Sequence, residues 1–276
     1  MPDVVRVRAS DFAKFTGHNK FVTHEEATAL LWQRNPKVAA ARGINVEPEA
    51  NEIERDFRKS SVPTQTAVRE SLCLPADAPV ERVVRAVHEK IVAPLAKVET
   101  TAQMTAQLDI LPTGLGTVRT TIEREAQKMR GTLREDASIN KIEQETGRAV
   151  GRRNEQYYQK TLPLDRTDIE VVVAGMLDGR FDDDGGIVEA KERRSRLFGY
   201  VVPYEMLQLH CYMFLTGTTK ATLVERLDEQ SERYEIAFSD DFWRHSLDKF
   251  ERFLEDCIPL PQAPPPPSKP ARRQKS

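Results

Sequence analysis

The pattern of apolar and polar positions is most regular between residues 138 and 258, where it predicts alternating helices and strands. The run "DIEVVVAGMLDGRF" is almost continuously apolar, which indicates a strand buried on both faces, and "DDDGG" predicts a tight turn after it. The runs "IVEAKER" and "KATLVERLD" predict two further strands. Helices are predicted for "ASINKIEQETGRAVGRRNEQYYQKT", "VPYEMLQLHCYMFLTG" and "DDFWRHSLDKFERFLEDC", the second of them ended by Gly217. This order of elements predicts an α/β fold with a mixed central sheet flanked by helices.

The rest of the chain divides into three further zones. Residues 1–43 read as an extended start followed by helices, with Ser10 and Thr23 as predicted N-caps and Glu26 completing a capping box with Thr23. Residues 44–137 are charged, helix-prone and interrupted by prolines, and they predict a helical insertion ahead of the core at 138–258. Residues 259–276 form a proline-rich and then basic tail, which has too little apolar surface to fold by itself.

Composition narrows the class of protein. The chain has 276 residues, of which 39% are hydrophobic and 30% charged, with a formal net charge of −2. This balance argues against coating nucleic acid through bulk charge, but it allows a local basic patch. No apolar run approaches the roughly 18 residues of a membrane helix, and the first residues contain no apolar signal core. The three cysteines are few and far apart, which is typical of a reducing compartment. We therefore expect an intracellular protein of the cytoplasm or nucleus, neither secreted nor in a membrane.

The segment "GGIVEAKERRSR" (185–196) contains the first candidate chemistry. Residues two apart on a strand share a face, so Glu189 and Lys191 should lie side by side. One interpretation is an ion pair at a strand end, which contributes little when it is exposed. The other is a nuclease site, which needs a second acid. Asp178 ends the preceding strand, and the predicted hairpin brings it next to Glu189.

This arrangement would suit a divalent metal. Asp178 and Glu189 offer two hard oxygen ligands, and the backbone carbonyl of Ala190 could be a third. Mg²⁺ or Mn²⁺ accepts one or two carboxylates and keeps several waters. Lys191 would orient the attacking water or offset charge on the phosphate. An Asp before Gly is also common in turns, so Asp178 alone indicates nothing specific.

Several nearby residues have two interpretations each. Gln208 and Tyr212 share a helix face, and Gln208 in so apolar a helix either bonds backbone or points at the metal site. Glu155 is either a third carboxylate or an ion-pair partner of Arg152. The basic cluster after Lys191 either holds the DNA backbone or is a solvated loop; its members are Arg193, Arg194 and Arg196.

Five motifs in order resemble those of the YqaJ-type viral recombinases, the lambda-type phage exonucleases of the PD-(D/E)XK nuclease superfamily. They are "RASDFAKFTGHNKF" (8–21), "GRRNE" (151–155), "LDG" (177–179), "GIVEAK" (186–191) and "QLHCYMFLTG" (208–217). The resemblance covers residues 6–35 and 147–228, with a longer helical insertion between them. It implies a PD-(D/E)XK restriction-endonuclease-like core, in which residues 1–43 are the N-terminal helical part of the nuclease domain.

The resemblance also implies roles for individual residues. Asp178 and Glu189 would bind metal, Lys191 would be catalytic, and Gln208 would line the site. Glu155 would be the helix acid near the metal, and Ser10 would lie near a 5′-phosphate pocket, while Arg152 and Tyr212 join the DNA-binding candidates. The family has a phosphate-binding arginine about two turns before the serine, where this chain offers only Arg6 and Arg8.

The expected function is a Mg²⁺- or Mn²⁺-dependent DNA exonuclease, acting 5′→3′ on double-stranded DNA ends in viral or phage-type recombination or end resection. The implied partner is a single-strand annealing protein, and a homo-oligomer is a further expectation. A structure-specific endonuclease of the RecB or Cas4 type is the alternative enzyme, because it shares the Gln-x-x-x-Tyr pattern. A non-catalytic DNA-binding subunit is the alternative from another class, which the intact Asp178, Glu189 and Lys191 argue against.

Overall fold

The computed structural model of the chain describes residues 3–47, 51–110, 116–151, 153–165 and 169–258. Two sheets form its centre, one with the strand order β1-β4-β3 and one with the order β2-β5-β6-β7-β8. Both are mixed, because β1 runs parallel to β4 and β6 runs parallel to β7, while the other neighbours are antiparallel. The strands are β1 (Val4–Arg8), β2 (Val150–Gly151), β3 (Tyr157–Thr161), β4 (Glu170–Met176), β5 (Gly179–Phe181), β6 (Ile187–Glu192), β7 (Lys220–Leu227) and β8 (Gln230–Ala237).

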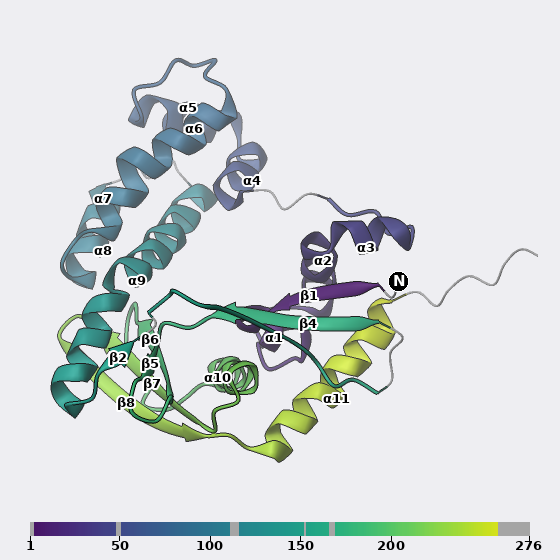
Figure 1. The fold of residues 1–276 in the computed structure, drawn as a ribbon. Helices are drawn as coiled ribbons and strands as arrows, with labels where there is room; N and C mark the ends of the chain where they lie inside the picture. The colour runs from purple at the N-terminus through teal and green to yellow at the C-terminus, as the bar shows by residue number, and fades with distance from the viewer. Residues whose placement is uncertain (1–2, 48–50, 111–115, 152, 166–168, 259–276) are drawn as a thin grey trace, which may run out of the picture.

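Helices cover these sheets and also form a separate arm (Figure 1). Those of the sheet region are α1 (Ala9–Phe15), α2 (His24–Arg34), α3 (Pro36–Ala41), α10 (Pro203–Thr216) and α11 (Asp240–Cys257). The arm contains α4 (Glu52–Lys59), α5 (Val62–Ser71), α6 (Val80–Val87), the π-helical turn η1 (His88–Val92), α7 (Ala93–Ala96), α8 (Thr101–Ile110) and the long α9 (Gly116–Thr146). The predicted fold class, a mixed α/β protein with sheets flanked by helices, is confirmed.

The hydrophobic core has three parts. The largest joins the inner face of β1 and β4 to α1, α2, α10 and α11, and Phe12, Leu31, Leu207 and Phe250 are among its buried members. The arm has a core of its own, built from residues such as Ile53, Phe57, Val87 and Ile122. A small third cluster packs the C-terminal half of α9 onto the five-stranded sheet. The arm is therefore an insertion with its own core, and α9 continues through the predicted boundary at residue 137 to reach the sheet.

The faces of β6 follow from the alternation of side chains along a strand. Ile187 points into the core shared with α10, whereas Val188 packs on α9 from the other side. Glu189 and Lys191 are in phase with Ile187, so they face α10, and Glu192 is in phase with Val188, so it faces α9. β6, the middle strand of the five-stranded sheet, thus directs both Glu189 and Lys191 toward α10.

Several local predictions are confirmed. The capping box of Thr23 and Glu26 is present, with Thr23 Oγ1 accepting from the Glu26 backbone N–H. The predicted helix at "VPYEMLQLHCYMFLTG" ends at Gly217, whose φ of 72° lies in the left-handed region that glycine adopts without strain.

Two local predictions are wrong, and one strand was not predicted. Ser10 is not the N-cap of α1, because the chain passes directly from β1 into the helix and Arg8 occupies the cap position without a side-chain hydrogen bond. The predicted helix over 137–161 ends at Thr146, and the short β2 and then β3 follow. The strand β8 was not predicted, because its mostly exposed and polar sequence "QSERYEIA" lies at a sheet edge.

Candidate active site

Asp178 and Glu189 meet where β4 gives way to β5. β5 and β6 pair antiparallel with Gly179 opposite Val188, so the next position of the same register sets Asp178 opposite Glu189. The carboxylate of Asp178 accepts a hydrogen bond of 2.8 Å from the backbone N–H of Ala190. The hairpin therefore brings the two acids to one edge, as the sequence predicted.

Lys191 and Gln208 complete a compact polar network around Glu189. Lys191 Nζ donates to Glu189 Oε1 over 2.6 Å and to Gln208 Oε1 over 3.3 Å. Gln208 Nε2 donates to Glu189 Oε1 over 2.8 Å and to the Tyr212 hydroxyl oxygen over 3.0 Å. Of the two interpretations of Gln208, the structure has the side chain pointing at the candidate site. Its amide accepts a hydrogen bond from Lys191 and donates one to Glu189.

Tyr212 can approach β4 because Gly175 has no side chain. A Cβ placed on Gly175 would lie 2.8 Å from Cε1 of the Tyr212 ring, which is closer than van der Waals contact allows. The tyrosine ring consequently packs against the strand one turn after Gln208, and the helix α10 is fixed in rotation relative to β4.

The electrostatics of the site are those of buried like charges. Burial raises the pKa of Asp178 well above its usual range, and the neighbouring charge of Glu189 raises it further. Burial also raises the pKa of Glu189, although Lys191 opposes this. Burial alone would lower the pKa of Lys191, but Glu189 and Asp178 outweigh it and raise the value. The lysine is therefore an ammonium that donates hydrogen bonds.

A third carboxylate comes from the arm and was missed by the sequence reasoning. Glu135 of α9 lies beside Asp178 and contributes to the raised pKa of that group. It also accepts a hydrogen bond of 2.8 Å from the Asn154 side chain. Glu155 had been expected in this place, but it is exposed in the turn before β3 and not on a helix. No local sequence signal marks Glu135, because only the tertiary packing of α9 brings it to the sheet.

The donor set fits a divalent cation. Glu189 is 2% exposed, and its Oε2 atom is buried without a hydrogen-bond partner, which is costly for a carboxylate oxygen. Asp178 lies beside it, and hard cations such as Mg²⁺ bind this kind of oxygen. Among the described residues, Asp, Glu, His and Cys form no group of three or more with the geometry to hold a metal. A metal here would therefore be held by Asp178, Glu189 and the Ala190 carbonyl, with water as the remaining ligand.

Arg193 is placed differently from the expectation that it holds DNA. Its guanidinium is buried and pairs with both oxygens of Glu205 at 2.6 and 2.8 Å, and with Glu225 at 2.7 Å. It also stacks on the Phe198 ring, 4.2 Å from its centroid. Buried charges of this kind must be paired, and the buried guanidinium uses three of its five N–H donors on these two acids. Its role is to join β6, α10 and β7 around the site.

The opposite face of β6 is tied to the arm. The carboxylate of Glu192 pairs with Arg130 at 3.3 Å and with Arg134 at 3.2 Å. The fully buried Arg130 also donates to the Val98 carbonyl at 2.7 Å and to Asp228 at 2.9 Å. The residue next to the catalytic lysine candidate is thus held by two arginines of α9.

The remaining basic candidates lie outside this network. Arg194 is exposed and pairs with Glu123 of α9. Arg196 is exposed in the same loop. Arg152 and residues 259–276 lie outside the described residues. Either interpretation of the loop, phosphate contact or solvated surface, stays open for Arg194 and Arg196.

Ser10 lines a cavity that adjoins the network. The cavity has a volume of about 410 Å³, and Arg8, Ser10, Tyr157, Met176 and Tyr212 are among its lining residues. Tyr212 is common to this cavity and to the Gln208 network. Tyr212 therefore links the cavity to the network around Glu189, and Ser10 shares the cavity with Arg8 from the end of β1.

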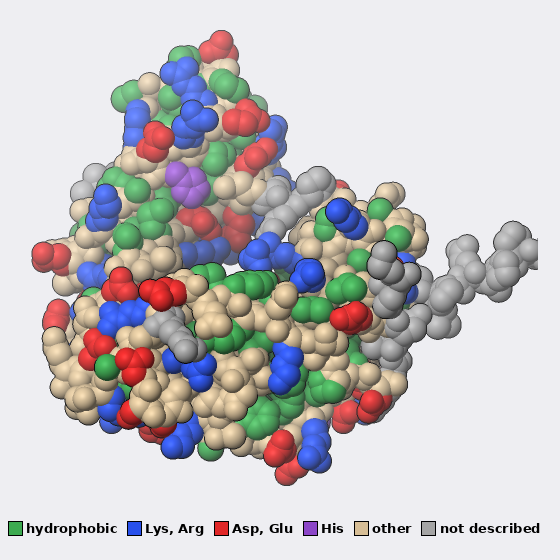
Figure 2. All heavy atoms as spheres, in the orientation of Figure 1, with side chains coloured by type: hydrophobic (Ala, Val, Ile, Leu, Met, Phe, Trp, Pro, Cys, Tyr) green, Lys and Arg blue, Asp and Glu red, His purple; other side chains and the backbone are tan. Residues whose placement is uncertain are grey.

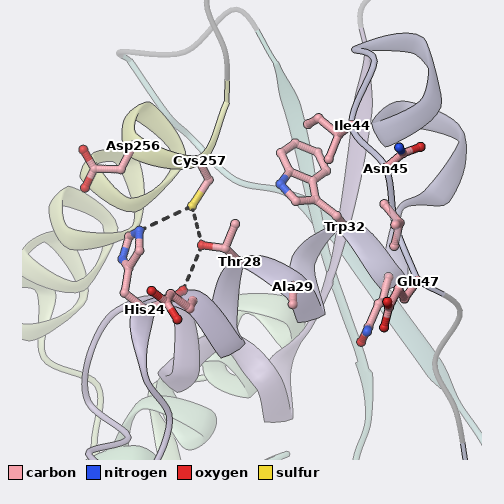
Figure 3. A pocket seen from close by; sticks show the side chains of 12 residues that line it. His24, Thr28, Ala29, Trp32, Ile44, Asn45, Glu47, Asp256 and Cys257 are labelled. Carbon is pink, nitrogen blue, oxygen red and sulfur yellow. Dashed lines mark hydrogen bonds between the residues drawn. The ribbon is translucent and has the colours of Figure 1, made fainter.

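A larger cavity of about 700 Å³ lies between α2 and the end of α11 (Figure 3). His24, Thr28, Trp32 and Cys257 line it, and Cys257 Sγ is 3.0 Å from Thr28 Oγ1 and 3.9 Å from His24 Nε2. Burial raises the pKa of the Cys257 thiol, which disfavours the reactive thiolate. This cavity contains none of the acids of the candidate site, and we assign it no chemistry.

No family model matches the chain, and no curated protein matches it. Solved structures with partial likeness include an alkaline exonuclease from Laribacter hongkongensis, at 20% identity and a TM-score of 0.38, over 62% of this chain and 92% of that one. A phage-related exonuclease from Haemophilus somnus 129PT has 12% identity and a TM-score of 0.35, over 62% and 93% of the two chains. Likeness of this extent does not establish a family, and the site geometry carries the functional argument. No helix among the described parts of the chain is long and apolar enough to span a bilayer.

Proposed function

We propose that this chain is a divalent-metal-dependent DNA nuclease that acts on duplex ends. The observation that carries the proposal is the buried, unpartnered Oε2 of Glu189 beside Asp178, with Lys191 and Gln208 bonded to the other oxygen of the same carboxylate. A site with these features has two acids to hold Mg²⁺ or Mn²⁺ and a cation that faces the same space.

The residues would divide the work of phosphodiester hydrolysis. A metal bound here would polarise the phosphate and lower the pKa of a bound water. Lys191, held between Glu189 and Gln208, would donate hydrogen bonds to the attacking water or to a phosphate oxygen that gains charge. Gln208, bonded to both groups, would hold the ammonium and the carboxylate in their present contact when the substrate enters.

The cavity beside Tyr212 favours an enzyme that holds a strand end. Ser10 is exposed at this cavity and could donate its hydroxyl hydrogen to a terminal phosphate, with Arg8 supplying charge. An exonuclease acting 5′→3′ is therefore the finer proposal, with duplex DNA ends as substrate. A role in viral or phage-type recombination, an annealing-protein partner and a homo-oligomer remain proposals that rest on the resemblance of the five motifs.

The test uses end-labelled linear duplex and closed circular duplex, each incubated with the protein in Mg²⁺ or in EDTA. An exonuclease degrades only the linear form, and only with metal. Nicking of the circle would support the endonuclease of the RecB or Cas4 type instead. Binding without cleavage of either form would contradict the nuclease and support a non-catalytic subunit.

A further inference from the structure

The outer face of the three-stranded sheet carries a row of exposed side chains next to the candidate site. Side chains of β1, β4 and β3 that share this face are Val4, Arg6, Arg8, Glu170, Val172, Met176, Tyr157, Gln159 and Thr161, together with the buried Ala174. The opposite face, with Val5, Val7, Val171 and Val173, is buried in the core. In Figure 1, α1 and α10 lie on the inner side of β1 and β4, and the arm rises beyond the outer side.

This face combines an aromatic ring, a thioether and two cations. Tyr157 is 61% exposed and Met176 is 44% exposed, and the two are directly opposite each other on β3 and β4. Arg6 and Arg8 alternate along β1, and Arg6 Nη1 reaches across β4 to donate to Gln159 Oε1 at 3.2 Å. Adjacent large side chains left in water commonly mark an interaction site.

The face leads directly into the candidate active site. Met176 is the last residue of β4, and Asp178 follows two positions later. The cavity of about 410 Å³ is lined by Arg8, Tyr157 and Met176 from this face and by Tyr212 from α10. Tyr212 also accepts from Gln208, so this side chain connects the cavity at the exposed face to the network around Glu189. Figure 2 shows Lys and Arg side chains around the hollow between the arm and the sheet region.

We infer that this outer face binds single-stranded DNA adjoining the scissile end, with unpaired bases stacked on Tyr157 and Met176 and phosphates held by Arg6 and Arg8. The inference rests on the proposed nuclease function and adds the path of the strand to it. A flat sheet face with an exposed ring is how several folds bind unpaired bases, because each base offers a face for stacking. A base inside a duplex has no free face to offer.

Charge also favours a nucleic acid over a protein partner. Arg6 and Arg8 are exposed cations of the face, and Glu170, the acid that shares it, lies at the end farther from Asp178 and accepts from Thr161 at 3.1 Å. The exposed apolar side chains of the face are Tyr157 and Met176, too small an area for a stable protein interface. Phosphates match the cations Arg6 and Arg8, and stacked bases match the exposed side chains of Tyr157 and Met176.

The test measures binding separately from cleavage. The full chain in EDTA is titrated with a fluorescent oligothymidylate of about 12 nucleotides, within the range that single-strand sites cover. Tyr157→Ala should weaken binding on the order of tenfold, and Tyr157→Phe should retain it because stacking needs only the ring. Arg8→Ala should reduce the dependence of log K on log salt by about 0.7, the loss of one single-strand phosphate contact.

Phe21→Ala is the matched control, because Phe21 is also an exposed aromatic residue but lies in the turn between α1 and α2. It should bind as wild type does. A second readout replaces the thymines with 5-iodouracil, and light should cross-link the DNA to the peptide that contains Tyr157 or Met176. Wild-type affinity of Tyr157→Ala, or cross-links confined to other peptides, would overturn the inference.

The same preparations are then tested for cleavage of linear duplex in Mg²⁺. If wild type cleaves the duplex but Tyr157→Ala binds the oligothymidylate as wild type does, the proposed nuclease function is supported and the proposed path of the strand is wrong. If Tyr157→Ala weakens binding but wild type cleaves nothing, the proposed nuclease function is wrong and the proposed single-strand-binding face is supported. A change in the sedimentation of DNA-free protein caused by Tyr157→Ala, with unchanged DNA affinity, would show that the face binds a second copy of the chain and would also overturn the inference.

Discussion

Gln208 donates to Glu189 and accepts from Lys191, so one amide holds the acid and the cation of the candidate site at fixed positions. A carboxylate or a hydrocarbon at this position could not do both. Gln208→Ala and Gln208→Glu should therefore each lower cleavage by about 10–100-fold, the effect typical of a residue that orients metal ligands.

The measurement is the initial rate of release of label from linear duplex at saturating Mg²⁺. Thr216→Ala is the control, because Thr216 is on the same helix but bonds only backbone carbonyls at its end. Equal rates for wild type and Gln208→Ala would show that the network of Gln208 is structural.

Glu189→Gln and Lys191→Ala should reduce cleavage by at least about 100-fold while DNA binding in EDTA is retained. The first removes a charged metal ligand and the second removes the hydrogen-bond donor to the reacting phosphate, whereas phosphate contacts elsewhere survive. Single-turnover cleavage and fluorescence binding are measured on the same samples. Cleavage at the wild-type rate in either variant would refute the assignment of the site.

Arg193 and Arg194 are neighbours in sequence with opposite expected behaviour. Arg193→Ala leaves Glu205 and Glu225 buried without their shared cation, and breaking such a pair costs about 3–5 kcal/mol of unfolding free energy. Arg194→Ala removes an exposed ion pair with Glu123, worth at most about 1 kcal/mol. Urea denaturation of the two variants provides the comparison.

The loop also allows a direct test of DNA contact. The double variant Arg194→Ala and Arg196→Ala should keep the wild-type stability, and it should reduce the salt dependence of DNA binding if these side chains contact phosphates. An unchanged slope would identify this loop as a solvated surface.

His18 should make stability depend on pH. Burial, together with the nearby charges of Lys249 and His245, lowers the pKa of His18 from 6.5 to about 4. Between these two values the unfolded chain binds more protons than the folded chain, so stability falls as the pH decreases through this window. The contribution of His18 is complete above pH 6.5.

The variant His18→Gln should remove part of this slope. His210, whose pKa is also lowered by burial, keeps its own contribution in both proteins, so the difference between wild type and variant isolates His18. The midpoint of urea unfolding is measured at several pH values from about 4 to 8, within the range over which histidines titrate. Parallel curves for the two proteins would contradict the prediction.

Ser10 provides a test for the recognition of strand ends. If its hydroxyl contacts a terminal phosphate, wild type should prefer 5′-phosphorylated over 5′-hydroxyl duplex, and Ser10→Ala should reduce that ratio. Since Ser10 is not the helix cap, the variant should keep the wild-type melting temperature. Equal rates on both kinds of end in wild type would argue against the pocket and for an endonuclease.

The acids and the lysine could be predicted because their relationships are local. Alternation along β6 places Glu189 beside Lys191, the hairpin places Asp178 opposite Glu189, and helical periodicity places Gln208 beside Tyr212. Each relationship spans few residues and follows from the geometry of one or two elements. The network that joins them depends only on α10 packing against β6.

The remaining features depend on tertiary contacts that leave no local pattern. Glu135 is one of many charged residues in a long polar helix, and only the packing of α9 brings it to Asp178. In the sequence Arg193 looks like a member of a solvated basic cluster, but in the structure it is buried and paired with Glu205 of α10 and Glu225 of β7. A charge that is paired inside the fold and one that is free on the surface read alike in the sequence.

The ion pairs between Glu192 and the arginines of α9 limit how the arm could be removed by protein engineering. A deletion that ends at residue 137 would remove the arm together with its own core. It would also take away Arg130 and Arg134, and Glu192 would be left as an uncompensated carboxylate adjacent to Lys191. A shortened chain would therefore have to keep α9 from Arg130 onward, or replace Glu192 with an apolar residue in the same step.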